Sequence, residues 1–492
     1  MKKFLLEFVV FVCGVVVMIF EIVGSRILGP YMGTSIFVWT SLIGIILGSL
    51  SLGYWLGGII ADKKPSYILL SWIILLAALF IGLTITGKDI VLRNLPRLFE
   101  GIRTQSIIAS LCLFAPTSIL LGMVTPYAVK LKIRDIKTSG KTVGNLYAIS
   151  TIGSIIGTFL AGFFLIPSIG STNILYFNAF LLIIVALTIF ILSKYFTSVV
   201  FGLVLLGVLL FYNIRFNSSE LSYIDIDTRY NRVLIYESVD WYTGKPIRIM
   251  RINNEYSSSM FLDNDSLVYP YLKYYQLAEH FKPNFRKTLM IGGAGYSYPT
   301  YYLKKYPQSY IDVVEIDKKL TELARTHFRL KDSPRLNIHH EDGRIFLNRT
   351  KNKYDVILGD AFKSIYTIPW QLTTLEAIKR EYDILTKDGV VIINIISTLE
   401  GPKSLFLQAE YNTYKAVFPQ VYLFDLNNFN DPAIMHSIIL LALKSDKKPT
   451  FSSPDPELDS YLQHVFRKKI HFQMPVLTDE HAPVEYYANK AI

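Results

Sequence analysis

Residues Thr288–Asp317, TLMIGGAGYSYPTYYLKKYPQSYIDVVEID, decide the fold of the second half of the chain. The apolar run Leu289–Ile291 is typical of a buried parallel strand. Three glycines follow it and let the backbone turn sharply and approach a ligand: Gly292, Gly293 and Gly295. The next residues favour a helix that ends at Pro307, and a second apolar strand covers Ile311–Ile316. The stretch therefore predicts a strand, a glycine turn, a helix and a second strand.

An acidic residue lies at the end of the second strand. Glu315 follows Gly292 by 23 residues. This is close to the interval of about 20 residues at which an acid meets the ribose hydroxyls of a bound nucleoside. Glycine turns and solvated strand ends also occur without a ligand, and that alternative stays open. The combined pattern favours a nucleoside site.

The alternation of strands and helices continues along the chain and predicts a doubly wound sheet. Asp342 and Asp360 follow two later predicted strands. Because the carboxyl ends of parallel strands share one edge of a sheet, we expect Glu315, Asp342 and Asp360 to lie at that edge. Asp342, which precedes Gly343, and Asp360 would also suit a helix N-cap, a common use of Asp.

The composition indicates a protein that is partly embedded in a membrane. The 492 residues are 51% hydrophobic and 14% aromatic, with a mean hydropathy of +0.34. Residues 1–215 carry 16 Lys and Arg against 6 Asp and Glu, so they hold +10 of the net charge of +11. The high pI therefore gives no reason to expect nucleic-acid binding. Cys13 and Cys112 lie in apolar runs and the histidines show no metal-ligand spacing, so we expect neither a disulfide framework nor a metal site.

Seven apolar runs approach the length of ~20 residues that crosses a bilayer. They are Leu5–Ile22, Ile36–Ile60, Ile68–Ile85, Ile107–Leu131, Val143–Ile166, Ile174–Leu192 and Val199–Tyr212. Glycines four residues apart allow close helix contact; the pairs are Gly44 and Gly48, Gly53 and Gly57, and Gly153 and Gly157. The sequence therefore predicts a transmembrane helical bundle over residues 1–214.

The charge bias and the number of spans disagree about the side of the membrane. With the N-terminus in the cytoplasm, the inside segments carry ten Lys and Arg residues and the outside loops carry five. This is the bias that the positive-inside rule describes. Seven crossings would then place the second half outside, away from the nucleotides of the cell. We expect that half to be cytoplasmic, at the inner cell membrane. Either one of the seven runs, Val199–Tyr212 first, is then not a crossing, or the orientation from the charge bias is wrong.

The second half is expected to contain two parts. A polar linker over 215–221 leads into short predicted strands with turns at Thr243–Gly244 and Asp263–Asn264. We expect a small β-rich cap over 222–285 and a Rossmann-like nucleoside-binding domain over 286–492.

This second half resembles the spermidine synthase family of aminopropyltransferases, whose fold is shared with S-adenosylmethionine-dependent methyltransferases. The segments that carry the resemblance are GGAG at 292–295, VVEID at 313–317, EDGR at 341–344, YDVILGDAF at 354–362 and LTDEHAPVE at 477–485. The full chain resembles bacterial fused proteins that join membrane spans to such a domain. The matching segments in the membrane half are FEIVGSR at 20–26 and GNLYA at 144–148.

The resemblance implies roles for the residues at the strand ends. Glu315 would accept hydrogen bonds from the ribose, Asp342 would accept one from the adenine amino group, and Asp360 would be the catalytic acid–base residue. The residues that would make room for the nucleoside are Gly292, Gly293, Gly295 and Gly343. The cosubstrate would be decarboxylated S-adenosylmethionine, or the intact form, with no tightly bound cofactor.

Three positions depart from the family pattern in the substrate pocket. Gly295 stands where soluble synthases carry an acid for the aminopropyl ammonium, and Lys363 stands where they carry a second acid for the diamine. Ser257 replaces a substrate-contacting Gln, whereas Tyr269 matches a tyrosine of the amine pocket. A dication such as putrescine needs carboxylates when it is desolvated. These departures weaken the prediction of a polyamine acceptor.

Three functions therefore stay open. The first is an aminopropyltransferase acting on an amine such as putrescine. The second is a methyltransferase that uses S-adenosylmethionine and a membrane-delivered acceptor. The third is a transporter or sensor whose soluble domain binds a nucleoside or polyamine without chemistry. The expected partners are a small amine and the lipid membrane, with no nucleic acid, and a homo-oligomer is an open alternative.

Overall fold

The structure is a computed structural model that describes residues 4–133, 135–195, 198–204, 207–208, 223–253, 255–361, 368–426, 434–467 and 472–489. The chain divides into two compact units. The first contains Met1–Ser222 and Ile226–Asn231, and the second contains Tyr223–Asp225 and Arg232–Ile492.

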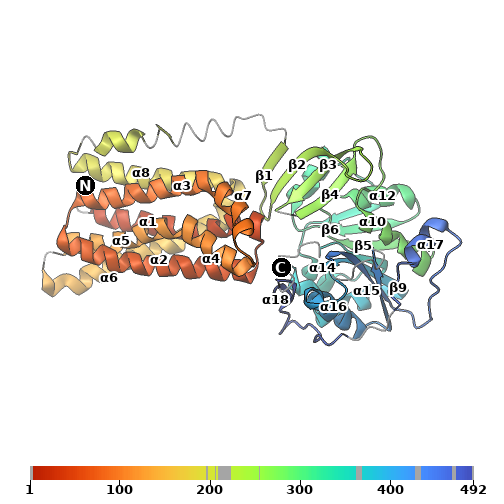
Figure 1. Cartoon of the computed structure of the whole chain (residues 1–492). Coiled ribbons are helices and arrows are strands. Elements are labelled where there is room, and N and C mark those ends of the chain that lie inside the picture. Colours follow the sequence, from red (N-terminus) through yellow and green to blue (C-terminus); the bar gives the residue numbers. More distant parts are fainter. Residues whose placement is uncertain are drawn as a thin grey trace. The chain divides into compact units, whose positions relative to one another are not determined.

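Long apolar helices build the first unit and run side by side (Figure 1). Their bounds are α1 Leu5–Met32, α2 Ile36–Lys63, α3 Tyr67–Leu98, α4 Ile102–Leu113, α5 Ala115–Lys132, α6 Ser139–Phe159, α7 Ile166–Ser168 and α8 Ser171–Leu192. Within the described residues, five helical stretches are long and apolar enough to cross a membrane, or six if the bent pair α4–α5 is one span. The first six predicted spans fall on these stretches, whereas Val199–Tyr212 extends beyond the described residues and stays a prediction.

The fourth predicted span, Ile107–Leu131, is broken into two helices. α4 and α5 are bent by 52° at the break. Pro116 lies in the first turn of α5 and has no N–H, so it interrupts the ladder of backbone hydrogen bonds. The hydroxyl of Thr84 in α3 donates to the carbonyl oxygen of Leu113 at 2.7 Å. This contact gives a backbone acceptor at the break a partner inside the bundle.

Glycines bring two pairs of helices into backbone contact. A Cβ atom at Gly153 of α6 would lie 2.2 Å from a carbonyl oxygen of α1. A Cβ atom at Gly53 of α2 would lie 2.2 Å from a carbonyl oxygen of α5. Only glycine allows this approach, as the sequence predicts for both positions. The predicted contact at Gly44 and Gly48 is wrong, because no described atom lies within 4 Å of a Cβ at either position.

A small sheet opens the second unit, with the strand order β1-β2-β3-β4. The bounds are β1 Tyr223–Asp227, β2 Arg232–Val239, β3 Pro246–Ile252 and β4 Glu255–Phe261. β2, β3 and β4 are antiparallel neighbours. Ile247, Ile249 and Phe261 form a small apolar core on this sheet, against which Tyr236 and Val268 pack.

A mixed seven-stranded sheet forms the centre of the second unit, in the order β10-β11-β9-β8-β5-β6-β7. The bounds are β5 Lys287–Ile291, β6 Tyr310–Val314, β7 Leu336–His339, β8 Tyr354–Gly359, β9 Leu385–Ser397, β10 Gln420–Asp425 and β11 His436–Leu443. The five strands from β9 to β7 in this order are parallel, and β11 and β10 continue the sheet antiparallel. The prediction of a Rossmann-like sheet is confirmed.

Helices cover the sheet (Figure 1). Their bounds are α10 Pro270–Lys273, α11 Leu277–Phe281, α12 Ser297–Lys305, α13 Lys318–His327, α14 Gly343–Arg349, α15 Leu375–Ile384, α16 Leu405–Lys415, α17 Pro456–Leu462 and α18 Val484–Asn489. Phe346 of α14, Ile378 of α15 and Phe406 of α16 share one core with Leu289 and Ile291 of β5. Side chains alternate along a strand, so the neighbouring β5 residues face the opposite layer.

The strand order brings four predicted positions to one edge. The glycine turn follows β5, Glu315 follows β6, Asp342 follows β7 after a short loop, and Asp360 follows β8 directly. All four strands are parallel, so these are their carboxyl ends, where ligands of such sheets bind.

Candidate functional site

The glycine turn lies directly against the backbone that follows β8. Gly292 has a φ of 95°, and a Cβ atom there would lie 3.1 Å from the carbonyl oxygen of Asp360. Both the conformation and the space therefore require glycine. A Cβ atom at Gly293 would lie 2.7 Å from the ring of Tyr296, whose hydroxyl lies 2.7 Å from that of Thr321. These contacts fix the turn beside Asp360.

Glu315 is buried, and its carboxylate holds the glycine turn. Oε2 accepts the N–H groups of Gly293 and Ala294 at 2.9 Å each, and Oε1 accepts the N–H of Asp317 at 2.9 Å. Burial raises the pKa of Glu315, the three amides oppose this shift, and the net direction is upward. Each carboxylate oxygen has two lone pairs, so Oε2 is fully used and Oε1 keeps one acceptor position for a hydroxyl donor.

Asp342 is the N-cap of α14, so the helix-cap alternative holds for this residue. Its Oδ1 accepts the N–H groups of Arg344 at 2.8 Å and Ile345 at 3.1 Å. Its Oδ2 accepts the side-chain amide of Gln371 at 3.3 Å. A Cβ atom at Gly343 would lie 2.9 Å from a methyl carbon of β5, so α14 begins in contact with the end of that strand. Oδ2 is the oxygen that could receive a ligand.

Asp360 faces two buried tyrosines. The hydroxyl of Tyr275 donates to Oδ1 of Asp360 at 3.1 Å. Burial raises the pKa of Tyr271 and Tyr275 far above its ordinary value, and the negative charge of Asp360 raises it further in both. Both hydroxyls therefore remain protonated, and that of Tyr275 donates to the carboxylate. The residues after Asp360 that a helix cap would serve, 362–367, lie outside the described part of the chain.

Sequence reasoning missed the two tyrosines at Asp360. They lie four residues apart in the segment YPYLKYY, 269–275, and in a helical conformation that spacing places them on one face. Tyr271 belongs to α10, and Tyr275 belongs to a 3₁₀ turn, Tyr274–Gln276, that joins α10 to α11. The density of tyrosine was the available signal, but it carries no information about which carboxylate the hydroxyls meet.

The three predicted substrate residues have different outcomes. Ser257 is buried in β4, where its hydroxyl donates to the carbonyl oxygen of Glu255 at 3.3 Å. Tyr269 stacks on Tyr271 with ring centroids 6.1 Å apart. Its buried hydroxyl has no hydrogen-bond partner among the described residues, and burial raises its pKa. Lys363 lies outside the described residues and stays a prediction.

Ser258, rather than Ser257, contacts the glycine turn. Its hydroxyl oxygen accepts the N–H of Gly295 at 2.9 Å. A Cβ atom at Gly295 would lie 2.6 Å from Cβ of Ser258. The serine therefore occupies the space that a side chain at position 295 would need. Sequence reasoning did not identify Ser258, because the pairing of β4 with this turn is a tertiary contact.

The C-terminal segment returns to the same edge of the sheet. Asp479 accepts a hydrogen bond from Arg344 at 2.7 Å and another from the hydroxyl of Thr374 at 2.6 Å. Leu375 donates its N–H to the carbonyl oxygen of Leu477 at 2.8 Å. Since Arg344 is two residues after Asp342, the segment lies beside the predicted adenine contact.

A second buried polar cluster holds the turn that carries Tyr275. Tyr274 is hydrogen-bonded to Nδ1 of His464, and Nε2 of His436 pairs with Asp425. Asp425 is fully buried at the end of β10, and its N–H donates to the carbonyl oxygen of His464 at 3.0 Å. Among the described residues, no group of three or more His, Cys, Asp or Glu is placed to hold a metal ion.

The stability of this cluster should depend on pH. Burial lowers the pKa of His436, but its hydrogen bonds to Asp425 and to the carbonyl of Ile434 outweigh burial, so the pKa is raised. The contribution of the His436 interaction to the free energy of unfolding is therefore fully present below the unfolded pKa of about 6.5. It is lost as the pH rises through the pKa of the folded state. Thermal melts should show that His436→Gln destabilises the protein by on the order of 1 kcal/mol at pH 5.5 and by less at pH 9.

The comparison of the two proteins at each pH isolates His436 from its neighbour. Burial is the largest influence on His464 and lowers its pKa. Its effect on the pH dependence of stability therefore has the opposite sign to that of His436, and it is present in both the wild type and the variant. A pH-independent difference between wild type and variant would contradict the assigned ion pair.

Part of the second unit is similar to known proteins. Residues 275–449 match the model of the spermine/spermidine synthase domain. A polyamine aminopropyltransferase of Vibrio vulnificus is 32% identical over 180 residues, which cover 36% of this chain and 56% of that protein. The eEF1A lysine and N-terminal methyltransferase of Homo sapiens is 30% identical over 145 residues, covering 27% of this chain and 20% of that protein.

A solved structure described as a probable spermidine synthase from Corynebacterium glutamicum is 24% identical and has a TM-score of 0.40. The matched region covers 52% of this chain and 90% of the chain in that structure. The chain spans little more than half the length of the first curated relative that it matches. Its second unit nevertheless contains a domain of the spermine/spermidine synthase family, with homology to polyamine aminopropyltransferases, and several apolar helices precede this domain in the same chain.

Proposed function

We propose that this protein is a membrane-bound aminopropyltransferase that moves the aminopropyl group of decarboxylated S-adenosylmethionine to an amine such as putrescine. The observation that carries the proposal is the position of Asp360. Its carboxylate accepts a hydrogen bond from the hydroxyl of Tyr275 at 3.1 Å, and its backbone lies against the glycine turn at Gly292. The reacting groups of donor and acceptor would therefore meet beside one half-buried carboxylate.

Asp360 would serve as the base of the transfer. The amine nitrogen of the acceptor attacks the carbon beside the sulfonium, a C–N bond forms, and the C–S bond breaks to leave a neutral thioether. The proton lost by the nitrogen passes to Asp360. Tyr271 and Tyr275 stay protonated because their pKa is raised, so they orient the carboxylate without competing for that proton. Carboxylate and aromatic surfaces also suit an ammonium ion before it is deprotonated.

The nucleoside would lie along the same edge of the sheet. Glu315 retains one acceptor position, on Oε1, for a ribose hydroxyl while it holds the turn at Gly293. Oδ2 of Asp342 would accept the adenine amino group in competition with Gln371. Ser257, Tyr269 and Lys363 are proposed for the acceptor side, where the hydroxyl of Tyr269 has no partner among the described residues.

Product analysis tests the proposal directly. The purified full-length protein in detergent is offered decarboxylated and intact S-adenosylmethionine with a panel of amines, and the products are identified by mass spectrometry. We expect an aminopropylated amine and methylthioadenosine with the decarboxylated donor. A methylated product that forms only with the intact donor would overturn the proposal.

One observation favours a methyltransferase as a second candidate. Ser258 fills the space beside Gly295, so no acid can stand where the resembling synthases bind the aminopropyl ammonium. The human relative named as a methyltransferase is also similar over part of this domain. The donor preference of the wild type therefore decides between the two reactions.

A double substitution tests whether the tail of the donor lies at this position. Gly295→Asp alone should destabilise the domain, since its Cβ would lie 2.6 Å from Ser258. Gly295→Asp with Ser258→Gly removes the clash and adds a carboxylate. Calorimetry should then show about ten-fold tighter binding of the decarboxylated donor, the effect of one charge-assisted hydrogen bond. The intact donor should gain less, because its own carboxylate is repelled. Equal gains for both donors would place the tail elsewhere.

The membrane arrangement is part of the proposal. Six crossings with a cytoplasmic N-terminus would satisfy the charge bias and place the transferase domain in the cytoplasm, where its nucleoside donor is made. This count treats α4 and α5 as one bent span, as the apolar stretches allow. A reporter fused after Ile492 that is active only outside the cytoplasm would contradict it.

A further inference from the structure

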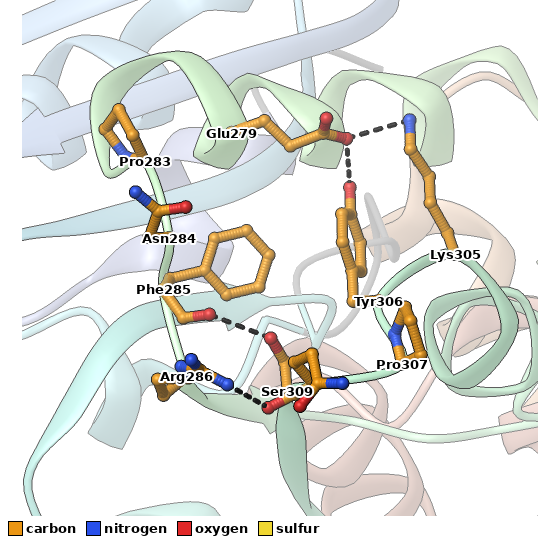
Figure 2. Close-up of a pocket in the computed structure, with 10 residues that line it drawn as sticks. Glu279, Pro283, Asn284, Phe285, Arg286, Lys305, Tyr306, Pro307 and Ser309 are labelled. Atoms are coloured by element: carbon orange, nitrogen blue, oxygen red, sulfur yellow. Dashed lines mark hydrogen bonds and ion pairs between the residues drawn. The ribbon is translucent and has the colours of Figure 1, made fainter.

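A pocket of about 480 Å³ lies at the edge of the sheet opposite to Asp360 (Figure 2). It is lined at the amino ends of β5 and β6 by Phe285, Arg286, Ser309 and their neighbours, and on the helix side by Glu279, Lys305 and Tyr306. The volume is within the range of ~300–1,000 Å³ that small-molecule sites occupy. Phe285 and Tyr306 form an aromatic wall, with ring centroids 4.9 Å apart.

Glu279, the one acidic residue of the pocket lining, is already paired, whereas Arg286 still has hydrogen-bond donors to offer. Glu279 accepts Lys305 at 2.8 Å and also the hydroxyl of Tyr306. Arg286 is exposed and uses Nη1 for the carbonyl oxygen of Gln308 at 3.2 Å. Its other guanidinium N–H groups have no hydrogen-bond partner among the described residues. The lining carries two cations against one anion, and this balance suits an anionic ligand.

We propose that this pocket binds a small anion with a phosphate or carboxylate group and that binding lowers the activity of the Asp360 site. The proposal rests on the proposed transferase function for its regulatory part only. Arg286 would present its fork to the anion, and Lys305 would turn from Glu279 toward it.

One helical segment connects the pocket to Asp360. Residues 270–281 contain Tyr275, whose hydroxyl donates to Asp360, and also Glu279, which lines the pocket. Lys305 binds this segment twice, at Gln276 and at Glu279. An anion that draws Lys305 away would therefore release the segment that positions Tyr275.

A row of packed tyrosines provides a second connection between the two edges. The ring centroids of Tyr275 and Tyr298 are 5.0 Å apart, those of Tyr298 and Tyr302 are 6.1 Å apart, and those of Tyr302 and Tyr306 are 5.0 Å apart. Tyr298 and Tyr302 are fully buried. Close-packed rings transmit a displacement because no free space absorbs it.

Binding is tested first and needs no enzymatic activity. Inorganic phosphate, adenosine 5′-monophosphate and succinate are titrated into the full-length protein by calorimetry. We expect at least one of them to bind and Arg286→Gln to weaken that binding about ten-fold, the effect of a charge-assisted hydrogen bond. Lys304→Met is the matched control, because Lys304 pairs with Asp265 outside the pocket and should leave binding unchanged. Failure of all three probes to bind, or equal loss in both variants, would overturn the site.

Coupling is tested with the probe that binds. We expect it to lower kcat at saturating substrates by about five-fold or more and to speed amide hydrogen exchange in residues 270–281. Lys305→Met should reproduce both effects without the probe and abolish the response to it. Arg286→Gln should keep the wild-type kcat and require more probe.

Hydrogen exchange separates the failure of this inference from that of the proposed function. If no transfer reaction is found, faster exchange in residues 270–281 on binding would still support the connection. Binding without a change in exchange would overturn the regulatory part, whatever the reaction.

Discussion

Asp360→Asn should lower kcat by about a thousand-fold, within the range of 10²–10⁴ that general acid–base groups contribute. Asparagine keeps the shape of the side chain and can still accept the hydroxyl of Tyr275, but it cannot take a proton from the amine. The substitution should therefore leave nucleoside binding within about three-fold of wild type, because only the transition state loses an interaction. Steady-state kinetics with the decarboxylated donor and calorimetry with methylthioadenosine measure the two quantities.

Two further variants control this experiment. Asp332→Asn removes an exposed carboxylate that pairs with Arg325, and it should leave kcat unchanged. Tyr275→Phe removes one donor to Asp360 but leaves the base, so its kcat should fall much less than that of Asp360→Asn. A turnover of Asp360→Asn within ten-fold of wild type would assign the base elsewhere.

Glu315→Gln should weaken the binding of methylthioadenosine by at least about a hundred-fold, since a buried charge-assisted contact is worth ~1.5–3 kcal/mol and more than one is lost. Gln offers one acceptor oxygen, whereas the Glu315 carboxylate accepts three backbone amides and is proposed to accept the ribose. The new amide NH₂ would face N–H donors, so the turn at Gly293 should open. Calorimetry measures the affinity, and thermal melts measure the stability.

A matched surface variant separates the ligand role from a general loss of charge. Glu322→Gln alters an exposed carboxylate of α13 that pairs with Lys319, and it should leave both the affinity and the melting temperature unchanged. If Glu315→Gln lowered the melting temperature but bound the nucleoside normally, Glu315 would be a structural residue of the turn only.

The central fold follows from local sequence signals. The apolar strands around Gly292 and Glu315 are short and are separated by turn and helix signals, and this order leaves few topologies. Because parallel strands end at one edge, the positions of Glu315, Asp342 and Asp360 could also be predicted before any contact was known.

Other features depend on contacts between distant segments. Tyr275 meets Asp360 across 85 residues of sequence, and Ser258 meets Gly295 across 37. No periodicity encodes such pairings. The break before Pro116 also escaped the prediction of spans, because a sliding measure of apolarity does not register one missing N–H. Asp342 is different, because its role as a helix N-cap involves only neighbouring residues. The sequence offered this role as an alternative, and the structure shows the capping hydrogen bond.

The glycine contacts between helices restrict how the first unit can move. α1 and α6 touch backbone to backbone at Gly153, and α2 and α5 do so at Gly53. If either pair slid by one residue, a larger side chain would replace the glycine and collide with the facing main chain. Each pair is therefore expected to move as one rigid helix pair. Any conformational change of this unit should then occur between these two pairs rather than within either of them.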